Sequence, residues 1–556
     1  MRCSRRFRCY PPWSERVLAA VLLLVLGSCS QQVRDDDSDS YVELQILGIN
    51  DFHGNLEAPR NDFGGAAYLA SHIRRAKAEE KHTTIVSAGD IIGATPLISS
   101  LFHDEPTIQF ANLLGLDYNG VGNHEFDEGK KELLRMQHGG PHPVDGESPA
   151  GPFTGADFRF LAANVIDDDS DETLFSAFAV EHYDGIPVAF IGLTLEDTPS
   201  VASSAAVAGL TFMDEADTIN ALVPQIRSRG IEAIVVILHE GGFPADGGED
   251  DCNDFRGPVV DIVARTHPAV DLFVTGHTHR HYLCLLNGRP VTSTGNAGRF
   301  YTRIGARLDR AGGDMTVVDF DNVPVTQDVE PAPDVEALVA RYRTLVEAVS
   351  SRIVGTITAD FTKEQNAAGE SVLGGLIADA QLAASKHAEQ GGAAMSFMNS
   401  GGIRSNLLYE PSDSERPGEV TFAEVFAVHP FGNHLVTMTL TGAQIRTLLE
   451  QQWLDRPARN ILMPSAGLSY TWRPGQPVGA RVDASSILLH GEPIDPDGRY
   501  RVVVNSFLAD GGDGFPLLRE GTERVDGGAD VDALKDYLGA NSPLSPVEPG
   551  RIRTLP

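Results

Sequence analysis

The stretch Gly122-Asn123-His124-Glu125-Phe126-Asp127 decides how this chain is interpreted, because it concentrates residues that bind metal ions. It offers an amide oxygen, an imidazole ring and two carboxylates within a few positions. The preceding run, Leu116 to Val121, is predicted to form a short strand that leads into it. We therefore expect a polar site where this strand ends.

Four further apolar runs stop at residues of the same kind. They are Leu44 to Asn50 before Asp51 and His53, Thr84 to Ala88 before Asp90, Ile231 to Leu238 before His239, and Leu272 to Thr275 before His277 and His279. A single histidine at a strand end is usually a packing residue, but packing does not explain five such clusters. Because ligands of α/β sheets collect at the carboxyl ends of strands, we expect one site at one edge of a sheet.

The donors at these strand ends define the class of metal. The set is Asp51, His53, Asp90, Asn123, His239, His277 and His279. Carboxylate, imidazole and amide ligands without thiolate favour Zn²⁺, Mn²⁺ or Fe. Seven donors are too many for one tetrahedral ion, whereas one shared carboxylate makes two sites of four. Two divalent metal ions would clamp a phosphoryl group and activate water.

The order and spacing of these residues resemble the signature of the calcineurin-like metallophosphoesterases. The matching segments are Asp51-Phe52-His53, Gly89-Asp90, Gly122-Asn123-His124-Glu125, His239 and Gly276-His277-Thr278-His279. The resemblance implies one metal site from Asp51, His53, Asp90 and His279, and a second from Asp90, Asn123, His239 and His277. It also implies a four-layer α/β/β/α sandwich with two mixed sheets. His124 would be the catalytic imidazole beside the phosphoryl group, with Asp127 as its partner.

Three stretches of the second half carry residues suited to a nucleotide. They are Asn399 to Arg404, Pro430 to Asn433 and Asn505 to Phe515. Aromatic side chains on loops stack on flat rings, and an arginine binds phosphate. The alternative is that Phe431 and Phe507 are core residues, and for Phe515, which precedes a proline, we expect the core.

These stretches resemble the C-terminal domain of the 5′-nucleotidase family, which includes UDP-sugar hydrolases and ecto-5′-nucleotidases. The resemblance implies that Phe431 and Phe507 stack on the base and that Asp513 binds the ribose. Asn399, Arg404 and Asn433 would be further substrate-binding residues. In this family the second domain rotates against the metal domain about a linking helix. One departure concerns specificity: Gly369 stands where many members carry an arginine that contacts substrate, and Gly375 replaces a common asparagine.

The 556 residues are too many for one core, and the sequence divides into five segments. They are a signal peptide (1–28), a flexible tether (29–40), the metallophosphoesterase domain (41–330), a linking helix (331–352) and an α/β nucleotide-binding domain (353–553). Within them, Gly64 to Lys81 and Asp214 to Arg229 are predicted helices, and Asp334 is the predicted N-cap of the linking helix. The segment from His138 to Gly155 is predicted to be a surface loop whose histidines take no part in metal binding.

The N-terminal segment has the pattern of an export signal. Several arginines precede the apolar run Val17 to Leu26, which is too short to span a bilayer. Leu26-Gly27-Ser28-Cys29 resembles the lipobox of bacterial lipoproteins, which implies cleavage before Cys29 and a lipid on its thiol. The alternative is an ordinary signal peptide with an incidental cysteine. We expect a membrane-anchored protein in the periplasm or at the cell surface, exported by either the Sec or the twin-arginine route.

Charge and cysteine content limit the partners. The net charge of −33 argues against a nucleic acid polymer, because phosphate backbones bind basic surfaces. Cys252 and Cys284 flank the strand of His277 and His279, and an exported protein permits a disulfide between them. Two independent free thiols are the alternative.

Taken together, the sequence predicts an exported two-metal phosphohydrolase that acts on nucleotides. A 5′-nucleotidase, with or without UDP-sugar hydrolase activity, is the preferred interpretation. A 2′,3′-cyclic-nucleotide phosphodiesterase/3′-nucleotidase would use the same metal centre, and a nucleotide-sugar or dinucleotide pyrophosphatase is a further alternative. A surface binding protein that has lost activity is the alternative from another class, and it would be expected to lack one of the metal ligands.

Overall fold

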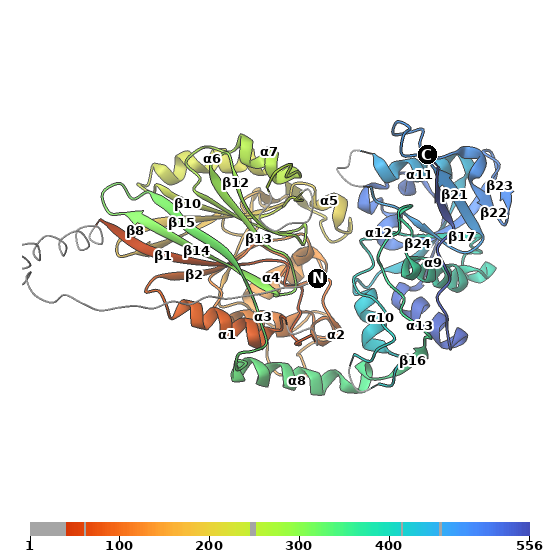
Figure 1. Cartoon of the computed structure of the whole chain (residues 1–556), viewed down its shortest axis with the longest axis horizontal. Coiled ribbons are helices and arrows are strands. Elements are labelled where there is room, and N and C mark those ends of the chain that lie inside the picture. The colour runs from red at the N-terminus through yellow and green to blue at the C-terminus, as the bar shows by residue number, and fades with distance from the viewer. Residues whose placement is uncertain (1–39, 60–62, 245–251, 413–414, 455–458, 556) are drawn as a thin grey trace, which may run out of the picture.

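The computed structural model describes residues 40–59, 63–244, 252–412, 415–454 and 459–555. Two α/β bodies are joined by helix α8 (Pro333–Ser350), as Figure 1 shows. The predicted signal peptide, Cys29 and nearly all of the tether lie outside the described residues. Within the described part of the chain, no helix is long and apolar enough to cross a membrane.

Two six-stranded sheets form the N-terminal body. The first has the order β15 (Met315–Pro324), β14 (Phe300–Asp309), β1 (Tyr41–Ile49), β2 (Thr83–Ser87), β3 (Tyr118–Gly120), β4 (Arg159–Leu161). The second has the order β12 (His281–Leu286), β13 (Arg289–Thr294), β11 (Leu272–Thr275), β10 (Ala233–His239), β8 (Ile186–Thr194), β7 (Phe178–Tyr183). Both sheets are mixed. In the first, β1 to β4 run parallel, and β14 pairs antiparallel with both β1 and β15. In the second, β8, β10, β11 and β13 run parallel, and the outer strands β7 and β12 pair antiparallel with their neighbours.

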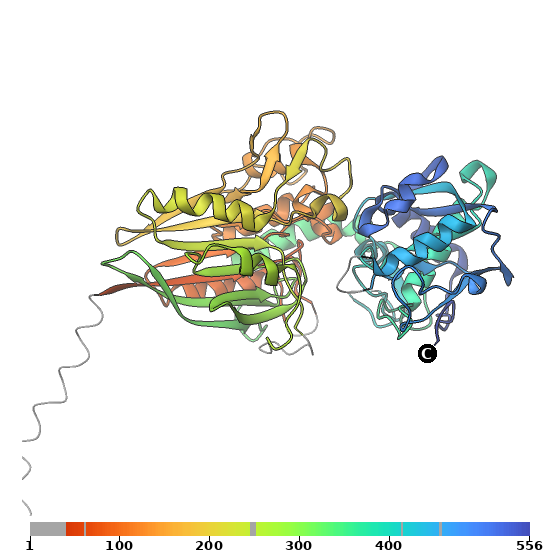
Figure 2. The same ribbon diagram turned by 90° about the horizontal axis from the view of Figure 1, so that it is seen from above.

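Helices cover the outer face of each sheet, and the inner faces pack on each other (Figure 2). Helices α1 (Ala66–Lys77), α3 (Glu105–Leu114) and α8 contribute to the core on one side. On the other side lie α6 (Glu215–Arg227) and α7 (Pro258–Arg265). The predicted four-layer α/β/β/α sandwich is therefore confirmed. The sheets approach closely at Gly120, where a Cβ atom would lie 2.9 Å from Ile237 Cγ2.

The C-terminal body is built on a five-stranded sheet. Its order is β20 (Met463–Pro464), β17 (Met395–Met398), β24 (Arg499–Asn505), β19 (His434–Thr441), β25 (Thr522–Ala529). Helices α9 (Val372–Ser385), α10 (Phe422–Val428), α11 (Gly442–Glu450) and α13 (Asp530–Asn541) surround it. Phe515 is fully buried in its core, as the sequence predicted.

The start of the linking helix differs from the prediction. Helix α8 begins at Pro333, and its N-cap is Ala332 rather than Asp334. Proline is favoured in the first turn because its missing N–H is not needed there. Ala332 is buried and donates its N–H to the Ala67 carbonyl, which fixes the entry of the helix. Asp334 lies inside the first turn and forms an ion pair of 2.7 Å with Arg74 of α1.

Candidate metal and substrate site

The predicted metal ligands converge, but not at the edge of one sheet. Asp51, Asp90 and Asn123 follow β1, β2 and β3 of the first sheet, whereas His239 ends β10 and His277 follows β11 of the second. The expectation of a single sheet edge was wrong, because the matching ends of two packed sheets share the site. This geometry depends on long-range packing that strand patterns do not reveal.

The first group of donors is Asp51, His53 and His279. His279 Nε2 lies 3.3 Å from Asp51 Oδ1 and 3.1 Å from His53 Nε2. His53 Nε2 is also 3.8 Å from Asp90 Oδ2, which places Asp90 between this group and the next. Asp51 and His53 are buried.

The second group is Asp90, His239 and His277, with Asn123 beside it. His239 Nε2 lies 3.0 Å from Asp90 Oδ2 and 3.2 Å from Asn123 Oδ1. His277 Nδ1 lies 3.0 Å from the same Asn123 oxygen. Asp90 therefore faces imidazoles of both groups, as expected for a shared ligand.

Hydrogen bonds behind the histidines fit this donor set to divalent metal ions. His53 Nδ1 lies 2.9 Å from the Gly93 carbonyl, and His239 Nδ1 lies 2.6 Å from the Ala88 carbonyl. A carbonyl only accepts, so both Nδ1 atoms are protonated and both Nε2 atoms face the site. Metal-bound histidines are held in this way. An Nε2 atom that faces a carboxylate or amide oxygen needs a proton or a metal ion between the two atoms.

Burial and charge favour the ligand forms of three of these groups, and His239 is the exception. Against the effect of burial, the charge of Asp90 raises the pKa of His239 to about 10, so a metal ion bound there takes the place of that proton. Burial holds the pKa of His53 well below its usual range, and burial together with His239 lowers the pKa of His277 to about 3. Burial alone would raise the pKa of Asp90, but the charges of His239 and His124 hold it well below its usual range. Neutral imidazoles and an ionised carboxylate are the states that bind metal.

Five of the donor residues share a strained backbone conformation with positive φ. Asp51, His53, Asp90, His277 and His279 all have φ between 46° and 68°. Positive φ is costly for residues other than glycine and clusters at functional sites. It is maintained here by a dense hydrogen-bond network. Glu125, which the sequence left without a role, accepts from the backbone N–H groups of Asp90, Ile91 and Gly122 at 2.6 to 2.9 Å.

The predicted catalytic pair is in contact. His124 Nδ1 lies 2.9 and 3.1 Å from the two carboxylate oxygens of Asp127. Against the effect of burial, the charges of Asp127 and Asp90 raise the pKa of the His124 imidazole. The His124 side chain is 14% exposed, so part of the ring remains accessible to solvent.

Two residues of the C-terminal body reach this centre. Arg404 Nη2 lies 3.3 Å from His53 Nε2, and the Arg404 guanidinium lies 5.7 Å from the centre of the Phe431 ring. The Phe431 ring stacks on His124, with ring centres 5.9 Å apart. The predicted phosphate-binding arginine and one predicted base-stacking ring therefore lie against the metal donors.

The other predicted substrate residues form a connected group. Asn399 donates to Asp513 Oδ2 at 2.6 Å and accepts from Asn505 Nδ2 at 3.1 Å. The Asn433 side chain accepts from Ser506 Oγ at 3.0 Å. Phe507 packs against Gly512, where a Cβ atom would lie 2.5 Å from the ring. Phe431 and Phe507 thus have different neighbours in this structure.

The position of Gly369 has a physical explanation. Its φ is +94°, and a Cβ atom would lie 2.4 Å from Ile461 Cγ1, so an arginine would not fit this backbone. A different cation lies beside Arg404: Lys363 Nζ donates to the Arg404 carbonyl at 2.9 Å. Burial, and then the charge of Arg404, lower the pKa of Lys363. Sequence reasoning missed this lysine because it belongs to none of the recognised motifs.

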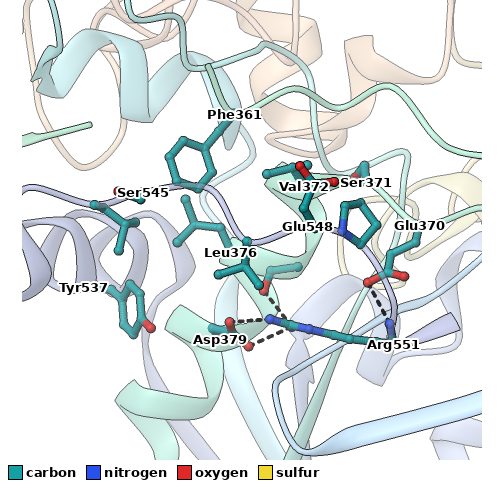
Figure 3. A pocket seen from close by; sticks show the side chains of 14 residues that line it. Phe361, Glu370, Ser371, Val372, Leu376, Asp379, Tyr537, Ser545, Glu548 and Arg551 are labelled. Carbon is teal, nitrogen blue, oxygen red and sulfur yellow. Dashed lines mark hydrogen bonds and ion pairs between the residues drawn. The ribbon is translucent and has the colours of Figure 1, made fainter. Parts of the chain in front are cut away.

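A separate hollow in the C-terminal body contains none of the predicted substrate residues (Figure 3). Arg551 crosses it and forms a two-pronged ion pair with Asp379, at 2.7 and 2.8 Å. The carboxylate of Glu370 accepts the backbone N–H groups of Arg551 and Ile552. These bonds fix the C-terminal segment to α9 and account for the polar residues of this hollow.

Comparison with known proteins agrees with this geometry. The calcineurin-like phosphoesterase family matches residues 44–281, and the 5′-nucleotidase C-terminal domain matches residues 353–520. The cell wall protein Lmo0130 of Listeria monocytogenes is 31% identical over 92% of this chain and 69% of its own length. The chain belongs to the 5′-nucleotidase family. It is therefore a phosphoric ester hydrolase, and calcineurin-like phosphoesterases use divalent metal ions.

Other relatives show how the family varies. Endonuclease YhcR of Bacillus subtilis is 29% identical over 95% of this chain, which spans 42% of that protein's length. A solved structure of a 5′-nucleotidase precursor from Thermus thermophilus superposes with a TM-score of 0.75 at 26% identity. It covers 92% of this chain and 99% of the Thermus chain. Members of the family thus carry names with different nucleic-acid and nucleotide substrates.

Proposed function

We propose that this protein is a 5′-nucleotidase, which converts a nucleoside 5′-monophosphate to a nucleoside and phosphate. The observation that carries the proposal is the placement of Arg404 and Phe431 against His53 and His124. A phosphate held by Arg404 would lie beside the metal donors, while a base that stacks on an aromatic ring would lie toward the C-terminal body. The likeness to the Thermus 5′-nucleotidase supports the same substrate class.

Different residues of this chain would bind the metal ions, act on the phosphoryl group and bind the ribose. Asp51, His53, Asp90 and His279 would hold one divalent ion, and Asp90, Asn123, His239 and His277 a second. When bound, the two ions supply Lewis acidity and lower the pKa of water. His124, oriented by Asp127, stabilises negative charge on the phosphoryl group or gives its proton to the leaving oxygen. Asn399 and Asp513 would bind the ribose hydroxyls.

We further propose that the protein is exported and anchored by a lipid on Cys29. We also propose the domain limits predicted from the sequence, with a metallophosphoesterase domain at 41–330 and a nucleotide-binding domain at 353–553. The basic and apolar N-terminal segment supports export, and the name of the Listeria relative, a cell wall protein, is in agreement. Pulse labelling with a radioactive fatty acid tests the anchor. Label on the wild type and none on Cys29→Ser is expected, and equal labelling of both would contradict it.

Phosphate release from a substrate panel tests the activity. The panel is AMP, 3′-AMP, 2′,3′-cyclic AMP, UDP-glucose and bis(p-nitrophenyl) phosphate, with Mn²⁺ or Zn²⁺ present and a coupled phosphatase for diesters. We expect AMP to be preferred, and His124→Ala to lower kcat by about 100- to 10,000-fold. Preference for the cyclic or 3′ substrate would keep the metal chemistry and overturn the pocket assignment.

A further inference from the structure

A second cluster of metal-type side chains lies outside the paired donor groups. His103 comes from the turn between α2 (Leu97–Ser100) and α3, and Glu128 from the turn before α4 (Lys130–His138). His142 comes from the hairpin closed by the His142–Gly146 bridge. The ligand atoms of these three residues and of Glu132 all lie within 4.8 Å of one another. The activity proposed above uses none of them. The sequence predicted no part in metal binding for His142, because no local pattern places it beside His103 and Glu128.

The distances within this cluster suit a tetrahedral ion. His103 Nδ1 lies 2.8 Å from Glu128 Oε2, and His142 Nε2 lies 3.9 Å from the same oxygen. Ligands about 2.0 to 2.2 Å from Zn²⁺ are about 3.3 to 3.6 Å apart in a tetrahedral site. The observed distances lie on either side of this range. The two rings stack at 3.6 Å in nearly parallel planes, and His142 Nδ1 accepts the Asp145 backbone N–H at 3.1 Å, so the neutral ring carries its proton on Nε2. The His142 ring must therefore rotate, and this proton must move to Nδ1, before Nε2 can bind an ion.

The charges around the two rings favour a cation. Glu128 and Asp145 contact opposite nitrogens of His103, at 2.8 and 2.9 Å. Against the effect of burial, the hydrogen bond to Glu128 is the main cause that raises the pKa of His103 to about 9. Protons on both stacked rings would repel each other at this separation. Glu132 is already neutralised by Arg135, so Glu128 and Asp145 supply the negative charge.

We propose that His103, Glu128 and His142 form a further divalent-cation site, suited to Zn²⁺, beside the catalytic pair. On binding, the cation takes the place of the proton between His103 Nδ1 and Glu128, and that proton is released to solvent. The fourth position is filled by water or by a carboxylate of Glu132 or Asp145.

The position of this site links it to the catalytic centre. Glu128 directly follows Asp127, and the neighbour of His103, Asp104, accepts the Gly93 N–H at 2.9 Å. The Gly93 carbonyl in turn lies 2.9 Å from His53 Nδ1. A cation that joins His103, Glu128 and His142 therefore ties together the turns that carry both the catalytic pair and a metal ligand. It stabilises the fold locally without touching the substrate.

Metal content of the purified protein tests the proposal directly. After equilibration with Zn²⁺ and removal of free ion, the wild type is expected to hold one zinc ion more than His142→Ala. Glu128→Gln is expected to lose the same ion. His138→Ala is the matched control, since it removes an exposed histidine of the same segment outside the cluster. Equal zinc content of the wild type and His142→Ala would overturn the proposal.

Histidine footprinting by diethyl pyrocarbonate, read by mass spectrometry, locates the ion without any mutation. Zn²⁺ is expected to reduce modification of His142 several-fold and to leave His138 unchanged. Modification of His142 that does not respond to Zn²⁺ would show that the cluster is only a hydrogen-bonded network. Because neither measurement depends on turnover, the result stands apart from the proposed activity.

Discussion

At the residue scale, the protein contains a buried acid–base pair that belongs to none of the recognised motifs. His429 and Asp530 are 1% and 2% exposed, and His429 Nδ1 lies 3.7 Å from Asp530 Oδ2. Among the described residues, neither side chain has a hydrogen-bond partner. Burial lowers the pKa of His429 to about 4 and raises the pKa of Asp530 to about 7. The pair lies beside the segment that carries Phe431 and Asn433. His429 precedes Phe431 by two positions, and the Asp530 N–H donates to the Asn433 carbonyl.

Removal of either partner should therefore change stability with opposite dependence on pH. In Asp530→Asn, buried His429 stays neutral where an unfolded histidine is protonated, so stability should rise between pH 4 and about 6.5. In His429→Gln, buried Asp530 holds a proton that the unfolded chain has lost, so stability should fall between about pH 4 and 7. Each slope is at most about 1.4 kcal/mol per pH unit.

Thermal midpoints of the wild type and both variants, compared across this pH range, measure these slopes. In the wild type the two effects nearly cancel, because the pair and its unfolded counterpart both hold about one proton there. Parallel curves for the three proteins would contradict the assignment. Leu435→Val, a change in the adjacent core, serves as the control for a loss of stability without a change in proton binding.

Lys363 is expected to compensate for the absence of an arginine at position 369. Its ammonium donates to the Arg404 carbonyl, and burial and then the charge of Arg404 lower its pKa, so it adds positive charge close to Arg404. Lys363→Met should raise KM for AMP by about tenfold, which corresponds to about 1.4 kcal/mol, and should leave kcat nearly unchanged. Steady-state kinetics measure the two constants separately. Lys386→Met, an exposed lysine after α9, is the control, and an equal effect of both changes would refute the role of Lys363.

At the scale of elements, the disulfide joins the loop after His239 to β12. Cys252 and Cys284 are bonded and are separated by 32 positions. A loop of this length is expected to contribute about 3 to 4 kcal/mol through restriction of the unfolded chain. Cys252→Ser with Cys284→Ser should therefore lower the thermal midpoint. Differential scanning calorimetry measures the loss, and an unchanged midpoint, or thiol labelling of both cysteines in the unreduced protein, would contradict the bridge.

Elements with strong local patterns could be predicted, whereas their ends and partners could not. The strands before Asp51, Asp90 and His239 were recognisable because apolar runs stop at polar donors. The helix predicted from Gly64 to Lys81 spans only Ala66–Lys77, since Gly64 and Gly65 have φ of +82° and +98°. The helix predicted from Asp214 to Arg229 spans Glu215–Arg227, and Asp214 is its N-cap, which accepts the Asp217 N–H. Helix caps and turns depend on a few local hydrogen bonds, and the alternative bonding patterns differ little in free energy.

The candidate site likewise combines features that the sequence predicts with features that only the structure reveals. Its predicted metal ligands and catalytic pair belong to a compact signature, and the structure brings these residues together. The carbonyls of Gly93 and Ala88 that orient His53 and His239 carry no side-chain signal. Contacts between segments that are distant in the sequence are needed to recognise Lys363 and the pair His429 and Asp530. Sequence patterns report chemistry that side chains carry locally, and not chemistry that the tertiary fold assembles.

At the scale of the whole molecule, the two bodies are closed over the metal donors. Besides the contact of Arg404 with His53, Ser204 Oγ of the N-terminal body lies 3.4 Å from Asp510 Oδ2 of the C-terminal body. Helix α8 buries Val335, Val339 and Tyr342 against the N-terminal body. It therefore moves with that body, and rotation is expected at its C-terminal end, near Ser350.

Release of the nucleoside should require this contact to open. A cysteine at each of positions 204 and 510, joined by a short thiol-reactive cross-linker, would hold the bodies together. We expect multiple-turnover phosphate release to fall at least tenfold in the cross-linked protein, because domain opening gates exchange of substrate and product. Each single-cysteine variant treated with the same reagent is the control for chemical modification. Cross-linked protein with undiminished turnover would show that the closed arrangement admits nucleotide, and the Phe431 ring on His124 would then have to move independently of the domain.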